Sequence, residues 1–270
     1  MSESKDVTEL EETQTEAQGE PEEAVAEWEI DAVLLDIEGT TTPISFVYSV
    51  LFPYARAHLR DYLREHLGDD DARDAALMLR AEWINERARG TDVPPWSDDS
   101  AEDRLAGLQA YAEWLMERDR KSPGLKLLQG HVWERGYQDA TLRGAVFPDV
   151  PEALQRWRAA EVDVAIYSSG SELAQRLLFG TTAYGDLTRL LTGFFDTGVG
   201  GKTFAGSYKR IAIAMGHAPE NILFISDMAR ELDAAREAGM QVVLCVRPGN
   251  AAQEIDDSIP VIYSFDEIGT

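Results

Sequence analysis

The chain has 270 residues, 49 of them acidic and 25 basic, and its formal net charge at pH 7 is -24. Nucleic acid and anionic membrane surfaces would both repel so acidic a protein, and we expect it to bind neither. The hydrophobic fraction of 44% is enough for a packed core, which excludes a wholly disordered chain.

Residues 1–28 form an acidic tail with almost no large apolar side chains. Much of the net charge lies here, because residues 1–29 hold eleven acidic residues against the single base Lys5. Such a segment gains too little from burial to offset the entropy lost on ordering, so we expect it to be disordered. A solvating extension is favoured over a binding tail.

The first strand is predicted at Ala32 to Leu35, a short apolar run. An insertion at 44–145 follows, and its hydrophobic periodicity is helical throughout. Its clearest helix comes after Ser97 and Ser100, which are typical N-cap residues, and ends before Pro123. We interpret 44–145 as a helical cap domain.

Beyond the insertion, short apolar runs alternate with helical patterns. Strands are predicted at 162–167, 222–225 and 242–246, and helices at 150–160, 171–179, 206–216 and 229–238. Near-continuous apolar strands separated by helices indicate a parallel sheet that is covered on both faces. The predicted fold class is therefore α/β, a doubly wound parallel sheet built from 29–43 and 146–270.

The single cysteine, Cys245, lies inside the last of these apolar runs. It cannot form an internal disulfide, and a small buried side chain is favoured there over a reactive thiol. No stretch has the length and apolar character of a signal peptide or a membrane span. We therefore expect a reduced, soluble, cytoplasmic protein.

Two carboxylates follow the first strand, at the sheet edge where reactive groups of open α/β folds gather. Asp36 ends the strand, Glu38 comes two residues later, and Gly39 permits a sharp turn directly after them. Side chains two residues apart leave an extended chain on the same side. This pair suits either a nucleophile with its acid/base partner or a site for a hard cation.

Three further strand ends or loops carry polar side chains. Ser168 and Ser169 precede a predicted helix, where hydroxyls and free backbone N–H groups suit phosphate oxygens, although serine there is also an ordinary N-cap. Lys202 follows a glycine-rich loop, and Asp227 ends the strand at 222–225. Each of these residues alone has an ordinary structural role. Gathering their charged and polar side chains at one sheet edge would cost stability, which favours a functional reason for the cluster.

These four segments resemble the four motifs of the haloacid dehalogenase-like phosphatase superfamily. Most members have Asp where this chain has Glu38. Longer strings resemble the enolase-phosphatase family of methionine salvage: Asp-Ile-Glu-Gly-Thr-Thr-Thr-Pro-Ile (36–44), Leu-Phe-Pro-Tyr (51–54), Leu-Gln-Gly-His-Val-Trp (128–133), Tyr-Ser-Ser-Gly-Ser (167–171), Leu-Leu-Phe-Gly (177–180) and Val-Arg-Pro-Gly-Asn (246–250). The resemblance spans about 31–265 and leaves out the acidic tail.

The resemblance implies a magnesium-dependent phosphatase in which Asp36 is the nucleophile and Glu38 the general acid/base. One Mg²⁺ per subunit would be held by Asp36, Glu38 and Asp227, with Glu38 using either its side chain or its backbone carbonyl. Glu231, one helical turn beyond Asp227, would point back toward the strand end and support the metal, or would be an ordinary helix residue.

By the same resemblance, Ser168, Ser169 and Lys202 bind and neutralise the transferring phosphate. The family substrate is 2,3-diketo-5-methylthiopentyl-1-phosphate, which is enolised and then dephosphorylated to the acireductone 1,2-dihydroxy-3-keto-5-methylthiopentene. Because its methylthio end is apolar, we expect apolar side chains of the cap to bind it, Phe46 and Leu51 among them.

Other functions are compatible with parts of this pattern. A phosphatase of the same superfamily that acts on another small phosphate ester would lack the enolase step. A dehalogenase would leave Glu38, Lys202 and Asp227 without a purpose, and the intact Asp36 and Lys202 argue against a catalytically silent binding protein. We expect a monomer whose partner is the small phosphorylated diketone.

Overall fold

The computed structural model describes residues 26–118, 120 and 122–269. Residues 1–25, to which most of the tail prediction applies, lie outside the described residues. The end of that predicted tail is part of the fold, because Ala26–Glu27 form strand β1 and pair in parallel with β8 (Ile268–Gly269). The predicted boundary at residue 28 was therefore too late.

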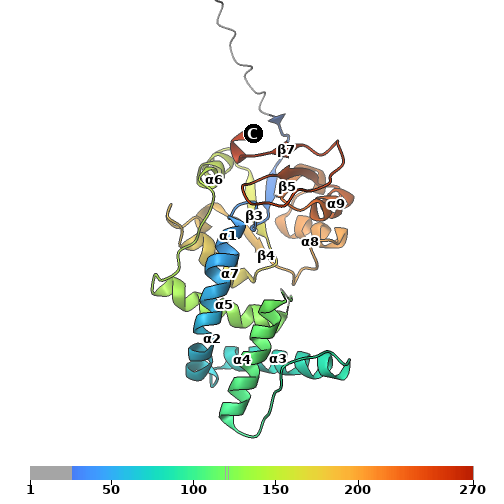
Figure 1. Cartoon of the computed structure of the whole chain (residues 1–270). Helices are drawn as coiled ribbons and strands as arrows, with labels where there is room; N and C mark the ends of the chain where they lie inside the picture. The colour runs from blue at the N-terminus through green and yellow to red at the C-terminus, as the bar shows by residue number, and fades with distance from the viewer. Residues whose placement is uncertain (1–25, 119, 121, 270) are drawn as a thin grey trace, which may run out of the picture.

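A parallel six-stranded sheet forms the centre of the larger lobe (Figure 1). Its order is β4 (Gly193–Phe195), β3 (Asp163–Tyr167), β2 (Ala32–Leu35), β5 (Ile222–Ser226), β6 (Gln241–Cys245) and β7 (Val261–Ile262). The four predicted strands are confirmed to within one residue. The edge strands β4 and β7 were not predicted, because runs of three and two residues are too short to show a period.

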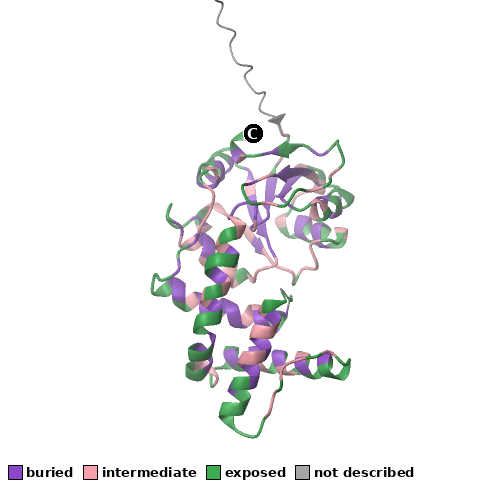
Figure 2. Ribbon diagram, viewed as in Figure 1, coloured by how far each residue is buried: buried purple, intermediate pink, exposed green. Residues whose placement is uncertain are grey.

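Both faces of this sheet are buried, which explains why its strands are apolar without alternation. In β2, Val33 and Leu35 face one side, packed with α6 (Asp149–Ala159) and α7 (Glu172–Gly180). Ala32 and Leu34 face the other, packed with α8 (Ala205–Met215) and α9 (Ala229–Glu237). Figure 2 shows the strands as a buried layer between these helices. The predicted doubly wound α/β class is confirmed.

The segment between β2 and β3 is helical, as predicted. It comprises α1 (Ile44–Phe46), the π-helical turn η1 (Val47–Leu51), α2 (Phe52–His66), α3 (Asp70–Ala88), α4 (Ala101–Glu117) and α5 (Pro123–Gln138). These helices bury an apolar cluster of their own, separate from the two clusters of the sheet. The Ser100 side chain accepts a hydrogen bond from Asp103 N and caps α4, as the sequence predicted.

Short 3₁₀ turns complete the core: η2 (Thr188–Leu190), η3 (Pro219–Asn221) and η4 (Phe265–Glu267). Cap and core meet where α5 packs on α7. The cap leaves the core directly after β2, so it stands over the carboxyl edge of the sheet. Among the described helices, none has the length and apolar character needed to cross a membrane.

Candidate active site

Asp36 lies at the carboxyl end of β2 at the start of a tight turn. Its backbone N–H donates to Ile225 O at 3.0 Å, and its carbonyl accepts from Thr41 Oγ1 at 3.0 Å. The Ile37 carbonyl accepts from the backbone N–H of residues 40, 41 and 42 at 2.9 to 3.2 Å. Gly39 has a φ of 75°, a conformation that other residues rarely adopt. This turn holds Asp36, which is only 5% exposed, in one place.

Lys202 connects two carboxylates that are far apart in the sequence. Its Nζ lies 2.5 Å from Asp36 Oδ1 and 2.5 Å from Glu231 Oε2. The Glu231 carboxylate also accepts from Ser226 Oγ at 3.1 Å, and Tyr208 Oη donates to the Lys202 carbonyl at 2.7 Å. The Glu231 carboxylate thus faces the site rather than solvent, which is the orientation predicted from its place one helical turn beyond Asp227.

Asp227 reaches the same place from the end of β5 and is 6% exposed. One of its carboxylate oxygens lies so close to Gly39 that a Cβ on this glycine would overlap it. The glycine of the first motif therefore serves two purposes. It supplies the left-handed turn, and it leaves room for the second buried carboxylate.

The buried cluster carries more negative than positive charge. Among the described residues, the carboxylates of Asp36 and Glu231 pair with the Lys202 ammonium group, and the carboxylate of Asp227 lies within their electrostatic influence. Burial, followed by repulsion from Asp36 and Glu231, raises the pKa of Asp227 to about 7. Burial and Asp36 likewise raise the pKa of Glu231 in spite of its ion pair. Burial alone would lower the pKa of Lys202, but Asp36 and Glu231 outweigh it and raise that pKa.

The serines that follow β3 differ in their hydrogen bonds. Ser171 is the N-cap of α7, since its side chain accepts from Ala174 N at 3.3 Å. Ser168 and Ser169 are thus released from capping, and both line a cavity beside the carboxylates. Ser168 N donates to Phe195 O at 3.1 Å, so for an anion this residue offers its hydroxyl rather than its backbone N–H. The capping role therefore belongs to Ser171, and phosphate binding by Ser168 and Ser169 stays a prediction.

An apolar chamber of about 100 Å³ lies between cap and core. Glu38, Ser168 and Ser169 are among its polar lining residues. Apolar side chains of cap and core form the walls, including Leu51, Leu115, Met116, Leu125, Trp133 and Leu178. Leu51 was predicted for this surface; Phe46, also predicted, does not line the chamber and instead packs against the apolar clusters of both cap and sheet.

Several residues of the site had no sequence signal of their own. Gln175 holds the loop after β3 by donating to Gly170 O at 3.0 Å and to Phe195 O at 2.8 Å. The chamber wall also carries Arg120, Lys126 and Gln129 from the cap. Arg120 lies between α4 and α5, whereas Lys126 and Gln129 belong to α5 and reach the chamber where α5 packs on α7. A single polar residue at such positions is ordinary in a sequence.

The structure thus brings Asp36, Lys202 and Asp227 together and places the other predicted residues, Glu38, Ser168 and Ser169, at the adjoining chamber. Within the described ranges, no three or more His, Cys, Asp or Glu side chains are arranged as a ready-made metal site. The predicted metal ligands Asp36, Glu38 and Asp227 stay a prediction. Two of these carboxylates with a backbone carbonyl and water remain compatible with a hard cation.

Comparisons with known proteins give a consistent result. Residues 30–239 match the family model described as haloacid dehalogenase-like hydrolase. The chain is 48% identical over 239 residues to Enolase-phosphatase E1 of Synechococcus elongatus, with 88% of this chain and 98% of the relative covered. It is 46% identical over 240 residues to a probable bifunctional methylthioribulose-1-phosphate dehydratase/enolase-phosphatase E1 of Populus trichocarpa, covering 87% of this chain but 46% of that longer protein.

Solved structures agree on the fold. The Unknown transcript 4 protein of Saccharomyces cerevisiae superposes with a TM-score of 0.69 at 32% identity, over 88% of this chain and 99% of that one. A phosphatase of the same superfamily from Thermococcus onnurineus, at 21% identity and a TM-score of 0.52 over 88% of this chain and 95% of that one, supports the fold alone. Motifs, sheet order and relatives together show that the chain belongs to the enolase-phosphatases of the haloacid dehalogenase-like hydrolase family.

Proposed function

We propose that this protein is a bifunctional enolase-phosphatase acting on 2,3-diketo-5-methylthiopentyl-1-phosphate. It enolises the diketone and then removes the phosphate to give the acireductone 1,2-dihydroxy-3-keto-5-methylthiopentene. The observation that carries the proposal is the meeting of a buried carboxylate–lysine cluster with an apolar chamber at Glu38 and Ser168. A substrate with an anionic end and an apolar methylthio end matches that division, and the relatives named enolase-phosphatase support the assignment.

In the phosphatase step Asp36 is the nucleophile. Lys202 pairs with Oδ1 of this carboxylate, so Oδ2 attacks phosphorus while the bond between phosphorus and the substrate oxygen breaks. The hydroxyls of Ser168 and Ser169 donate to the phosphate oxygens, and Lys202 balances the charge that meets there. Glu38 gives a proton to the leaving oxygen and later takes one from the water that hydrolyses the phosphorylated Asp36.

The buried cluster also fits Mg²⁺. Its carboxylates outnumber the ammonium group of Lys202, so a divalent cation would relieve their repulsion, and both Asp36 and Asp227 offer the oxygen ligands that Mg²⁺ prefers. We assign the cation to these two carboxylates and to the backbone carbonyl of Glu38, one ion per subunit, with water completing the set. When bound, Mg²⁺ neutralises charge on the phosphate and on a developing enolate oxygen.

The enolisation step removes a proton from C1 of the substrate. Glu38 is the proposed base, because its side chain lines the chamber next to the serines that fix the phosphate. The apolar walls exclude water from this position and orient the carbon chain. We further propose that the protein works as a cytoplasmic monomer and binds neither nucleic acid nor membranes, in keeping with its net charge of -24.

A phosphatase for another small phosphate ester is the second candidate. Two cationic side chains on the chamber wall, Arg120 and Lys126, are the observation in its favour, since they would suit a substrate with an additional anionic group; Arg120 would first have to leave Glu86, with which it pairs at 2.8 Å. Turnover of a panel of phosphorylated sugars and acids distinguishes the two functions. The enolase-phosphatase proposal requires the diketo phosphate to have the highest kcat/KM of the panel by a wide margin.

The direct test supplies the diketo phosphate and follows enediol absorbance and free phosphate separately. Both signals are expected from the parent protein, and both should require Mg²⁺. Asp36→Asn should abolish phosphate release, because the neutral amide cannot attack phosphorus. Phosphate release without an enediol signal would refute the enolase step, and sustained turnover by Asp36→Asn would refute the covalent mechanism.

A further inference from the structure

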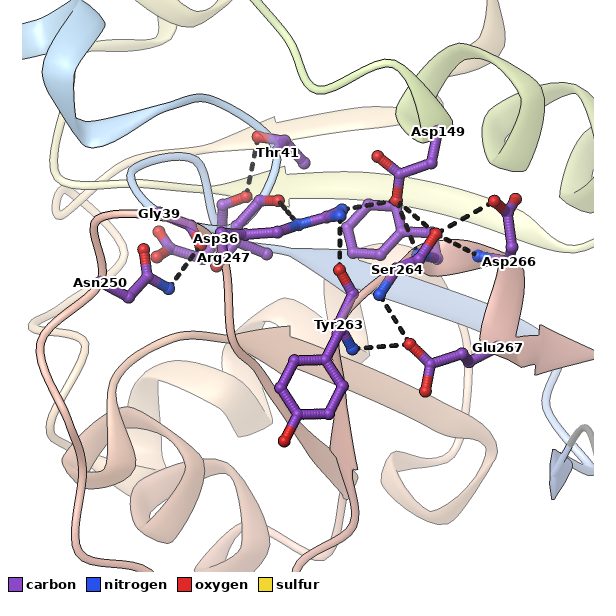
Figure 3. Close-up of polar contacts among 12 residues, drawn as sticks. Asp36, Gly39, Thr41, Asp149, Arg247, Asn250, Tyr263, Ser264, Asp266 and Glu267 are labelled. Carbon is purple, nitrogen blue, oxygen red and sulfur yellow. Dashed lines mark hydrogen bonds and ion pairs between the residues drawn. The ribbon is translucent and has the colours of Figure 1, made fainter. Parts of the chain in front are cut away.

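The segment Val-Arg-Pro-Gly-Asn at 246–250 has no part in the mechanism above. It follows β6 at the carboxyl edge of the sheet and lies against the turn that carries Asp36 (Figure 3). Arg247 and Asn250 both donate hydrogen bonds to backbone carbonyls of this turn. The segment thus contacts the catalytic turn directly, although more than 200 residues separate them in the chain.

Arg247 anchors the segment to the core. Its side chain is buried and pairs with Asp149 Oδ2 at 2.7 Å, while Nη1 donates to Tyr263 O at 2.9 Å. Its Nε donates to Thr40 O at 3.2 Å. A planar guanidinium held on both sides in this way has little freedom to move. The loop after β6 is therefore a rigid support for whatever Asn250 does.

Asn250 holds the neighbouring peptide of the same turn. Its Nδ2 donates to Gly39 O at 2.9 Å and to Cys245 O at 3.3 Å. Both partners are carbonyl oxygens, which only accept hydrogen bonds, so the atom of the Asn250 amide that faces them must be the nitrogen. The other end, Oδ1, must then face the opposite direction.

The Oδ1 atom is buried and, within the described part of the chain, accepts no hydrogen bond. It lies 2.8 Å from the position that a Cβ on Gly39 would take, and the Asp227 carboxylate is also in contact with that position. The two oxygens therefore approach the same point beside Gly39. An acceptor beside a carboxylate is unfavourable unless a donor lies between them, and a buried acceptor without a donor costs stability.

We infer that Asn250 is a positioning residue of the cation site, which locks the Gly39 peptide through Nδ2 and accepts a hydrogen bond through Oδ1 from a water on the cation beside Asp227. The inference rests on the proposed function only in assuming that cation. A water bound to Mg²⁺ is a strong donor, and Mg²⁺ usually keeps several of its waters.

The test is Mg²⁺ titration of the full chain by isothermal calorimetry, without substrate, so that activity is not the readout. Asn250→Ala removes both donor and acceptor and should weaken Mg²⁺ binding about 10- to 100-fold, the usual effect of removing a partner of metal ligands. Asn250→Asp loses the Nδ2 donor but keeps acceptors at the Oδ1 position. It should bind Mg²⁺ at least as tightly as the parent.

A matched control is Asn221→Ala, since the Asn221 amide donates to Asp31 Oδ2 at 2.7 Å at the other edge of the sheet. This variant should leave Mg²⁺ affinity unchanged. Thermal melting of each variant separates a loss of affinity from a loss of folding. Asn250→Ala with parental affinity, or Asn250→Asp as weak as Asn250→Ala, would overturn the inference. A parent protein without saturable Mg²⁺ binding would refute the cation site as well, whereas parental binding without turnover would refute only the proposed function.

Discussion

The charge imbalance around Asp227 leads to an unusual prediction: removing this carboxylate should stabilise the metal-free protein. Asp227 is buried against Asp36 and Glu231, and Lys202 is the single base in the cluster. Asn is nearly isosteric with Asp but carries no charge. We therefore expect Asp227→Asn to relieve the repulsion that the folded parent sustains in the absence of a cation.

The magnitude follows from the pKa of Asp227, which rises from an ordinary value of 3.8 to about 7. Each pKa unit between the folded and unfolded states is worth about 1.4 kcal/mol. At pH 8 the ionised Asp227 carboxylate therefore lowers the free energy of unfolding of the parent by about 4 kcal/mol. Solvent screening and relaxation of the side chains reduce this effect, and we expect a gain of about 2 to 4 kcal/mol in Asp227→Asn.

The pH dependence has a definite sign. The folded protein holds the Asp227 proton more tightly than the unfolded chain does, because its folded pKa is the higher one. The contribution of this group to stability is therefore greatest below about pH 4 and is lost as the pH rises to about 7. The advantage of Asp227→Asn over the parent should be smaller at pH 5 than at pH 8.

Urea denaturation at pH 5 and pH 8 in the presence of EDTA measures these differences. The same titration with Mg²⁺ should stabilise the parent, by about 2.7 kcal/mol at a hundred times Kd, and should leave Asp227→Asn almost unchanged. If the parent at pH 8 in EDTA is as stable as the variant, the carboxylates do not repel one another as described. The excess-charge argument for a divalent cation would then be wrong.

Two further predictions concern the chamber and the junction of cap and core. Leu51→Asn should raise KM for the diketo phosphate, because Leu51 lines the chamber. It should barely change hydrolysis of p-nitrophenyl phosphate, which lacks the apolar tail. Equal losses in steady-state assays of both esters would disprove recognition by the chamber. Gly144→Ala should cost about 2 kcal/mol in urea denaturation, because its Cβ would overlap the Leu178 carbonyl, whereas Gly68→Ala, which meets no atoms, should be neutral.

The sequence alone determined the main elements of the core and the residues at its reactive edge. A strand buried on both faces must be apolar along its whole length, so Ala32–Leu35 and Ile222–Ser226 were visible without any tertiary information. Because such strands are parallel, their carboxyl ends had to share one edge of the sheet. That geometry predicted the meeting of Asp36 and Asp227 before any distance was known.

The tertiary structure decided which of the side chains interact. Lys202 pairs with both Asp36 and Glu231, and the sequence carries no signal for the partner of a lone lysine. The division of work between Ser168 and Ser171 also depends on where α7 begins, and two nearby serines in a sequence do not show which one caps it. Short edge strands such as β4 are strands because they pair with a neighbour, and their own residues show no recognisable strand pattern.

The chamber and the Asn250 contact were beyond prediction for a related reason. A local pattern reports how one segment buries its own apolar face, whereas Asn250 meets Gly39 across 211 residues, in an arrangement set by the order of β2, β5 and β6 in the sheet. The apolar walls likewise combine Leu51 and Trp133 of the cap with Leu178 of the core. The sequence determined which reactive side chains were available, and the packing of distant segments decided which of them meet at the carboxylate cluster and at the chamber.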